Sequence, residues 1–142
     1  MNLYLDTSAL VKLYVKEEGS ESIRDAIGRA RLASTSVIAY VEARAAFARR
    51  RREGGLRVSD YRRVIRSLDV DWPHFVRLEA SESLIRDAAR LAEVHGLRAY
   101  DAIHLASALV LKQRLGAPVV LGCWDTELKS AAPKAGLQFF PD

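Results

Sequence analysis

The sequence predicts an α/β protein: a three-layer α/β/α sandwich around a five-stranded, mostly parallel sheet. Short apolar runs alternate with helical patterns along the whole chain, which favours strands joined by covering helices. Two of the apolar runs lead directly into an aspartate and then a helical pattern, as in parallel sheets. No repeat, low-complexity tract or linker divides the 142 residues, so we expect one domain over residues 1–142 with a single sheet.

The expected strands are short apolar segments bounded by turn-forming or charged residues. The first begins almost at the N-terminus and the last closes the chain next to Pro141. The third follows Trp72-Pro73, which we interpret as a loop. The expected strands cover residues 2–5, 32–35, 75–78, 118–121 and 137–140.

The expected helices carry apolar residues at intervals of three and four, which places those residues on one face. Gly54-Gly55, Gly96 and Gly136 supply stop signals for three of them. The segment 99–115 is apolar nearly all round and should be the most buried helix. In order, the expected helices are 8–16, a segment marked by Ile23 to Ala30, 37–52, a segment marked by Tyr61 to Leu68, 84–95, 99–115 and 126–135.

The composition favours a globular protein, with 49% apolar and 28% charged residues. Because Cys123 is the only cysteine, no disulfide can form within the chain, which suits a reducing cytoplasm. The longest apolar stretch, 102–111, is too short to span a bilayer, and we expect no membrane association. A net charge of +4 is compatible with a polyanionic partner.

Four acidic residues lie where this fold would gather them. Asp6 and Asp125 follow apolar strand patterns, so both should lie at the carboxyl edge of the sheet. Glu42 and Asp101 lie in helices with mostly apolar neighbours, an expensive place for an isolated charge. Carboxylates close together repel one another, whereas oxygen ligands of this kind are those that Mg²⁺ or Mn²⁺ prefers. The pattern therefore predicts a metal site.

Helix capping is the alternative for the three aspartates. Asp6, Asp101 and Asp125 each stand near the start of a helical pattern, and aspartate is a favoured N-cap. Capping does not account for Glu42, which lies inside a helix; its alternative is an exposed side chain on a small-residue surface. Both interpretations remain open on the sequence alone.

Four segments resemble the motifs of PIN-domain ribonucleases, and in particular the VapC-type toxins of toxin–antitoxin systems. The resemblance covers essentially the whole chain, with the four acids in the same order and spacing. The segments are 2–10 (NLYLDTSAL), 36–42 (SVIAYVE), 100–106 (YDAIHLA) and 124–128 (WDTEL). One departure is Cys123-Trp124, where a small polar residue and phenylalanine are more usual.

The resemblance implies a PIN-like fold and a Mg²⁺-dependent endoribonuclease, with Mn²⁺ as a possible substitute. It also implies a cognate antitoxin protein and a homodimer. Carried over by position, the catalytic and metal-binding residues are Asp6, Glu42, Asp101 and Asp125, with Thr7 or Ser8 as a polar contact near Asp6.

Two further features have both a functional and a structural interpretation. The basic run Arg49, Arg50, Arg51 and Arg52 would contact RNA phosphates, or would be a solvated helix end whose cations suit the helix dipole. His104 follows Asp101 by three residues on the same helix face, and we expect it to be buried or to support the acids, since no zinc-type ligand set accompanies it.

Other functional classes remain as alternatives. A haloacid-dehalogenase-like phosphatase also places an aspartate after its first strand, but it needs a second aspartate two residues later, where this chain has Ser8. A receiver-like or catalytically inactive PIN-like binding module is a non-enzymatic alternative. A receiver needs paired acids near the first strand, which this sequence lacks.

Overall fold

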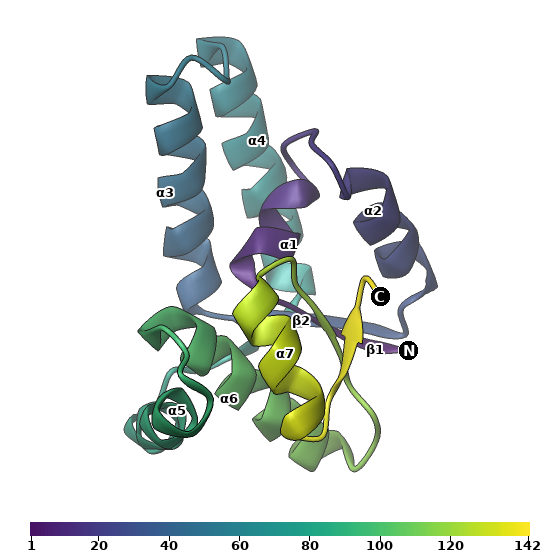
Figure 1. The fold of residues 1–142 in the computed structure, drawn as a ribbon. Coiled ribbons are helices and arrows are strands. Elements are labelled where there is room, and N and C mark those ends of the chain that lie inside the picture. Colours follow the sequence, from purple (N-terminus) through teal and green to yellow (C-terminus); the bar gives the residue numbers. More distant parts are fainter.

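The protein has an open sheet of five parallel strands in the order β3-β2-β1-β4-β5 (Figure 1). The computed structural model describes residues 1–142. This topology confirms the predicted α/β class, and the sheet is parallel throughout. The strands are β1 (Asn2–Leu5), β2 (Leu32–Ser36), β3 (Val76–Leu78), β4 (Val120–Gly122) and β5 (Gln138–Phe140).

Helices cover both faces of this sheet. The residues that pack on one face come from the first four helices, and those on the other face come from the last three. The first layer contains α1 (Thr7–Lys12), α2 (Ser20–Arg29), α3 (Ile38–Arg52) and α4 (Val58–Asp71). The second contains α5 (Glu82–His95), α6 (Ala99–Leu115) and α7 (Thr126–Lys134).

Strand β1 lies at the centre of the sheet and divides the core between these two layers. Successive side chains of a strand point to opposite faces. Leu3 and Leu5 therefore pack with the first layer, and Tyr4 packs with the second; all three are fully buried. Helix α6 contributes seven buried residues and is the most buried helix, as its sequence predicts.

Two local predictions need correction. The first helix ends at Lys12 rather than near residue 16, and the chain then turns. The turn is held by polar contacts: Lys12 pairs with Glu17 at 3.0 Å, and the Ser20 hydroxyl donates to the Val15 carbonyl at 3.1 Å. In addition, Trp72–His74 forms a short 3₁₀ helix (η1), where the sequence suggests a loop.

The strand order creates a topological switch point between β1 and β4. From β1 the chain builds β2 and β3 on one side, and later β4 and β5 on the other. In open α/β sheets, functional sites lie at the carboxyl ends of strands beside such a point. The register sets Leu5 opposite Gly122, so the residues that follow these two strands emerge side by side.

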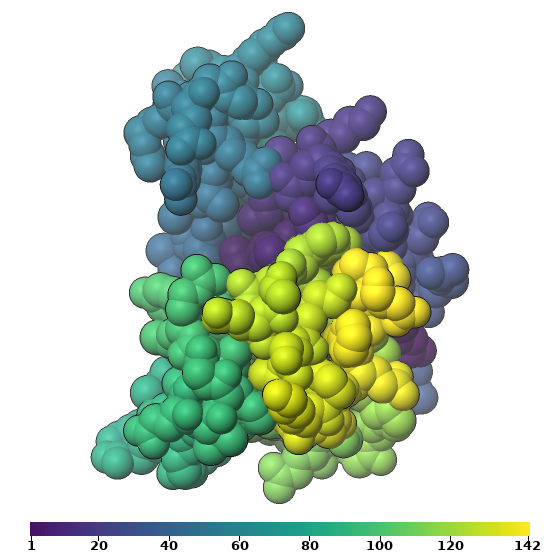
Figure 2. Space-filling model, viewed as in Figure 1, coloured from purple at the N-terminus to yellow at the C-terminus, as the bar shows by residue number.

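The α3–α4 pair forms a projection from the rest of the molecule. Figure 1 shows these two helices antiparallel and extending away from the sheet, and Figure 2 shows them as a separate blue and teal lobe. In the space-filling view, the purple N-terminal part of the chain is visible at the base of this lobe, above the green C-terminal half. None of the helices has the length and apolar character needed to cross a membrane.

Candidate functional site

Asp6 lies directly after β1 at the switch point and is only 3% exposed. Its carboxylate oxygen Oδ1 accepts hydrogen bonds from the Ser8 hydroxyl at 2.7 Å and from the Ala9 amide at 2.9 Å. Burial raises the pKa of Asp6 to about 6, although the charge of His104 and these two hydrogen bonds oppose the rise. Asp6 therefore caps α1, as the alternative interpretation expects, but its charge is also poorly compensated.

Glu42 projects from the first part of α3 and is held by two neighbours. Its oxygen Oε1 accepts a hydrogen bond from the Thr7 hydroxyl at 2.7 Å and lies 2.9 Å from Nε2 of His104. Burial by itself would raise the pKa of Glu42, but the hydrogen bond and charge of His104 lower it below its usual value. The exposed-side-chain interpretation of Glu42 is wrong, because this carboxylate is fixed and ionised.

His104 connects Glu42 to the core. The ring is 2% exposed, and its Nδ1 lies 2.8 Å from the Tyr4 hydroxyl. Since an ionised carboxylate only accepts hydrogen bonds, the proton on Nε2 must point to Glu42. In the neutral ring, Nδ1 then accepts from Tyr4, whose pKa is well above its ordinary value because of burial. The prediction that His104 is buried and supports the acids is confirmed.

Asp101 and Asp125 form a second, more exposed group. Asp125 caps α7 by accepting from the Leu128 amide at 2.9 Å, whereas Asp101 is inside the first turn of α6 and caps nothing. One arginine bridges both carboxylates: Nη2 of Arg98 lies 3.3 Å from Asp101 and 3.0 Å from Asp125. Burial and the charge of Asp125 raise the pKa of Asp101, against the effect of Arg98.

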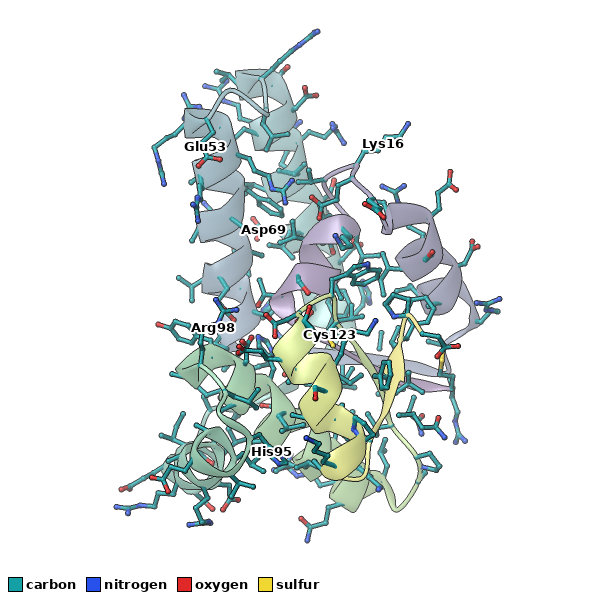
Figure 3. All side chains as sticks on the ribbon, in the orientation of Figure 1. Lys16, Glu53, Asp69, His95, Arg98 and Cys123 are labelled. Carbon is teal, nitrogen blue, oxygen red and sulfur yellow. The ribbon has the colours of Figure 1, made fainter.

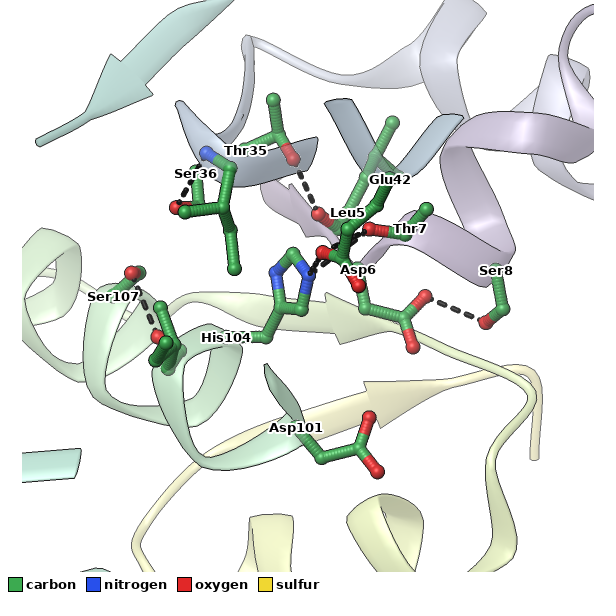
Figure 4. A network of polar contacts seen from close by, with 12 residues as sticks. Leu5, Asp6, Thr7, Ser8, Thr35, Ser36, Glu42, Asp101, His104 and Ser107 are labelled. Carbon is green, nitrogen blue, oxygen red and sulfur yellow. Dashed lines mark hydrogen bonds and ion pairs between the residues drawn. The ribbon is translucent and has the colours of Figure 1, made fainter. Parts of the chain in front are cut away.

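The fold gathers all four predicted acids at one edge of the sheet. The charges of Asp6 and Asp101 influence each other, as do those of Asp101 and Asp125. Figure 4 shows Asp6, Glu42 and Asp101 around His104, from three different elements. Nevertheless, no three His, Cys, Asp or Glu side chains in the structure are already arranged to hold a metal ion. The oxygen donors suit Mg²⁺ or Mn²⁺ in chemistry, but the site is not preassembled.

The two hydroxyls that follow Asp6 have different roles. Thr7 contacts Glu42 and lies 3.1 Å from Nε2 of His104, so it belongs to the Glu42 network. Ser8 donates to Asp6 and accepts a hydrogen bond from the Trp124 amide at 3.1 Å. Ser8 therefore links the segment after β1 to the segment after β4.

The unusual Cys123-Trp124 pair is accommodated next to this link. Cys123 is fully buried, and the Trp124 ring packs edge-on against Phe140 at 6.1 Å between centroids. The backbone of Gly19 lies so close to Trp124 that a Cβ at this position would come within 2.7 Å of the indole. Lys12 covers the Trp124 ring at 4.9 Å. These contacts fix the loop that carries Asp125.

The arginine run lies at the far end of α3 from Glu42. At 1.5 Å per residue, Arg49 to Arg52 are about 10–15 Å along the helix from this acid. Two of them are already paired, Arg49 with Glu53 at 3.1 Å and Arg50 with Glu17 at 2.6 Å. Arg51 lies over the Tyr61 ring at 5.2 Å. The local contacts favour the solvated-helix-end interpretation, and RNA binding by this run stays a prediction.

Two residues of the site do not stand out in the sequence-based prediction. Tyr4 occupies the strand position whose side chain points to the His104 layer; a polar-tipped residue inside an apolar strand is the signal that could reveal it. Arg98 precedes Asp101 by three residues, a spacing that brings side chains together at a helix start. Figure 3 marks Arg98 at the beginning of α6.

Comparisons with known proteins agree with this geometry. Residues 3–128 match the family model described as PIN domain. The chain is 35% identical over 140 residues to Ribonuclease VapC45 of Mycobacterium tuberculosis, covering 98% of this chain and 94% of that protein. It is 32% identical over 110 residues to Ribonuclease VapC3 of Pyrobaculum aerophilum, covering 76% and 82%.

A solved structure shares the fold at lower sequence identity. This is a toxin-antitoxin complex from Klebsiella pneumoniae, with a TM-score of 0.65, 16% identity, and coverage of 94% of this chain and 93% of that chain.

Proposed function

Because this chain belongs to the PIN-domain family, we propose that it is a metal-dependent endoribonuclease that acts as the toxin of a toxin–antitoxin pair. The observation that carries the proposal is the grouping of Asp6, Glu42, Asp101 and Asp125 at the switch point of the sheet. Relatives of 32–35% identity are named ribonucleases, which supports RNA as the substrate class.

We propose that these four carboxylates hold Mg²⁺, or Mn²⁺ in its place. The fit is supported by the cost of leaving the acids alone: burial and neighbouring charge disfavour the ionised forms of Asp6 and Asp101. When bound, a divalent cation would supply activated water and would neutralise the charge that develops on a cleaved phosphodiester.

The chain's own residues prepare the acids for this role. Thr7 and His104 keep the Glu42 carboxylate ionised and fix its direction before any cation arrives. Ser8 and the Ala9 amide orient Asp6, whose charge then favours a cation or a proton. The buried Tyr4 hydroxyl is hydrogen-bonded to the His104 ring and orients it, so the core also fixes the direction of the contact between His104 and Glu42.

The remaining parts of the proposal concern partners. The toxin role implies an antitoxin protein that blocks the site, and it rests on the motif resemblance to VapC-type toxins. A homodimer and phosphate contacts by Arg49, Arg50, Arg51 and Arg52 belong to the same proposal. Cellular RNA as the substrate implies action in the cytoplasm. The phosphatase and receiver-like alternatives have no support from the family match.

The proposal is tested with purified protein and single-stranded RNA. We expect internal cleavage with millimolar Mg²⁺ or Mn²⁺ and none with EDTA. Co-purification with the product of a neighbouring small gene should yield an inactive complex. Cleavage that persists in EDTA would overturn the metal requirement, and absence of cleavage with every divalent cation would overturn the nuclease.

A further inference from the structure

We propose that Arg98 is a built-in counter-cation that holds Asp101 and Asp125 together in the metal-free protein and must be displaced before a divalent cation can bind them. This inference rests on the proposed function, because it assumes that these acids are metal ligands. According to this proposal, Arg98 competes with the divalent cation for the two acids and therefore raises the metal concentration needed to fill the site.

The bridging geometry is the first observation. The guanidinium reaches both acids with the same nitrogen, Nη2, and its Nε also donates to Oδ2 of Asp101 at 3.3 Å. Asp101 lies in α6 and Asp125 directly precedes α7, and Arg98 is the one cationic side chain within ion-pairing distance of both. The raised pKa of Arg98, caused first by the charge of Asp101 and then by Asp125, agrees with this placement.

Unequal exposure is the second observation. The Arg98 side chain is 75% exposed, whereas Asp101 and Asp125 are 15% and 23% exposed. The acids are thus fixed in the wall of the site, while the arginine reaches over them from outside. Because the guanidinium is already mostly hydrated, the arginine can swing into solvent without a large change in its own solvation, and the main cost is the repulsion left between the two acids. The acids remain for another cation to use.

The third observation is the incomplete metal group. Four oxygen-donor acids meet at this edge, yet no three of them are poised to hold a cation. Two of the four have their outer oxygens committed to Arg98, Oδ2 in both cases. A divalent cation must therefore compete with a guanidinium for these two oxygens, and Arg98 would weaken metal affinity even after release through simple charge repulsion.

A matched pair of variants separates this role from a general charge effect. Arg98→Gln removes the bridging charge. Arg86→Gln removes an equivalent charge from α5, where Arg86 is 73% exposed and pairs with Glu82 at 3.0 Å, outside the site. Mn²⁺ binding to the full chain, followed by electron paramagnetic resonance or calorimetry without RNA, gives the dissociation constant. Arg98→Lys keeps the charge but cannot bridge in the same bidentate manner.

We expect Arg98→Gln to bind Mn²⁺ about threefold to tenfold more tightly than the wild type, since a unit charge near a dication is removed. Arg86→Gln should change the constant by less than about 1.5-fold, because a distant exposed charge is screened. Arg98→Lys should fall between the wild type and Arg98→Gln. In EDTA, Arg98→Gln should melt earlier than Arg86→Gln, and Mn²⁺ should raise its melting temperature more.

The outcomes separate the two proposals. Equal Mn²⁺ affinity in Arg98→Gln and Arg86→Gln, or weaker binding in Arg98→Gln, overturns the counter-cation role while leaving the nuclease intact. Mn²⁺ binding that appears only in Arg98→Gln supports the role strongly. If neither the wild type nor Arg98→Gln binds Mn²⁺ while the chain remains folded, the metal site and the counter-cation role both fail.

Discussion

The two halves of the acidic site are built in opposite ways. Asp6 and Glu42 are held by hydrogen bonds from Ser8, Thr7 and His104, and these contacts lead into the core. Asp101 and Asp125 have Arg98 as their only cationic partner, and that partner is mostly in solvent. The inner half is thus held by contacts with the core, whereas the outer half is held by an exposed arginine that can leave.

The difference shows where the fold places electrostatic cost. Glu42 is kept ionised by His104, whereas buried Asp6 has no cation in direct contact and its pKa rises to about 6. Among the outer acids, burial and the charge of Asp125 also raise the pKa of Asp101, but Arg98 offsets part of this rise. A divalent cation would relieve strain at Asp6 but would have to replace an existing partner at Asp101. These halves should therefore respond differently to the same substitution.

In activity, however, the halves should behave alike. Asp6→Asn and Asp101→Asn should each lower the rate of RNA cleavage by about 100-fold or more, since a lost metal ligand costs several kcal/mol of transition-state stabilisation. The measurement is cleavage of single-stranded RNA with Mg²⁺, with folding checked by circular dichroism. Asp87→Asn, on the exposed face of α5, is the control. Full activity in either variant would remove that half from the catalytic site.

In metal-free stability, the halves should separate. Asp6→Asn should stabilise the protein in EDTA at pH 7.5 by roughly 1–3 kcal/mol, because it removes a buried charge and asparagine caps nearly as well. Asp101→Asn should stabilise the protein by a smaller amount, because the lost pair with Arg98 offsets part of the relief from burial and from repulsion by Asp125. Denaturant unfolding measures both. Equal effects would erase the distinction between the halves.

The pH dependence follows from the same buried charge. The pKa of Asp6 is raised from 3.8 to about 6, so the folded protein binds a proton more tightly than the unfolded chain. The metal-free wild type should therefore lose stability as the pH rises from about 4 to about 6, and then level off. Asp6→Asn should show a flatter profile in this window. A stability that increases through the window by the same amount in both proteins contradicts the assignment.

The hydrogen bonds of His104 provide a test of the inner half of the site. His104→Gln should destabilise the protein by about 1–3 kcal/mol, since it disturbs the buried contacts of Tyr4 and Glu42. It should also weaken Mn²⁺ binding by releasing Glu42. Tyr4→Phe should cost about 1 kcal/mol and weaken Mn²⁺ binding less, because it removes only the core-side hydrogen bond to His104 and leaves the contact with Glu42. His95→Gln on α5 is the control. An unchanged Mn²⁺ constant in His104→Gln would reduce the histidine to a packing role.

The smallest effect is expected far from either half. Replacing Arg49 to Arg52 with alanine should weaken RNA binding and reduce the salt slope by about one unit per lost phosphate contact. Since Arg49 and Arg50 already have acidic partners, we expect at most two such contacts. Filter binding at several salt concentrations measures the slope. An unchanged slope assigns this run to the solvated helix end.

The sequence predicts the sheet well, for physical reasons. Even strands as short as β1 can be predicted, because their apolar runs stand out between segments with the 3.6-residue periodicity of helices. Asp6 directly follows the first of these apolar runs. The sequence also suggests Asp101 as a candidate but does not predict its environment, because the bridge from Arg98 to Asp125 joins segments 27 residues apart. Likewise, Tyr4 and His104 are 100 residues apart. Such pairs depend on strand order, which periodicity does not encode.

The early end of α1 has a similar explanation. Its apolar pattern continues through Tyr14 and Val15, which are indeed buried, but in a turn rather than a helix. The Tyr14 hydroxyl donates a hydrogen bond to Asp71 at 2.9 Å, and the Ser20 hydroxyl donates one to the Val15 carbonyl. At Val15, a side-chain hydrogen bond therefore satisfies a carbonyl that a longer helix would have used, and local patterning cannot predict that exchange.

A double-mutant cycle on Mn²⁺ affinity tests most directly whether the two halves form one metal site. The proteins are the wild type, Asp6→Asn, Asp101→Asn and the double variant, each titrated with Mn²⁺ at pH 7.5 without RNA. We predict that each single substitution weakens binding by about tenfold or more, and that the double variant loses less than the sum of the two free-energy changes, because ligands of one ion are coupled. Single variants that bind Mn²⁺ as tightly as the wild type would contradict a shared site.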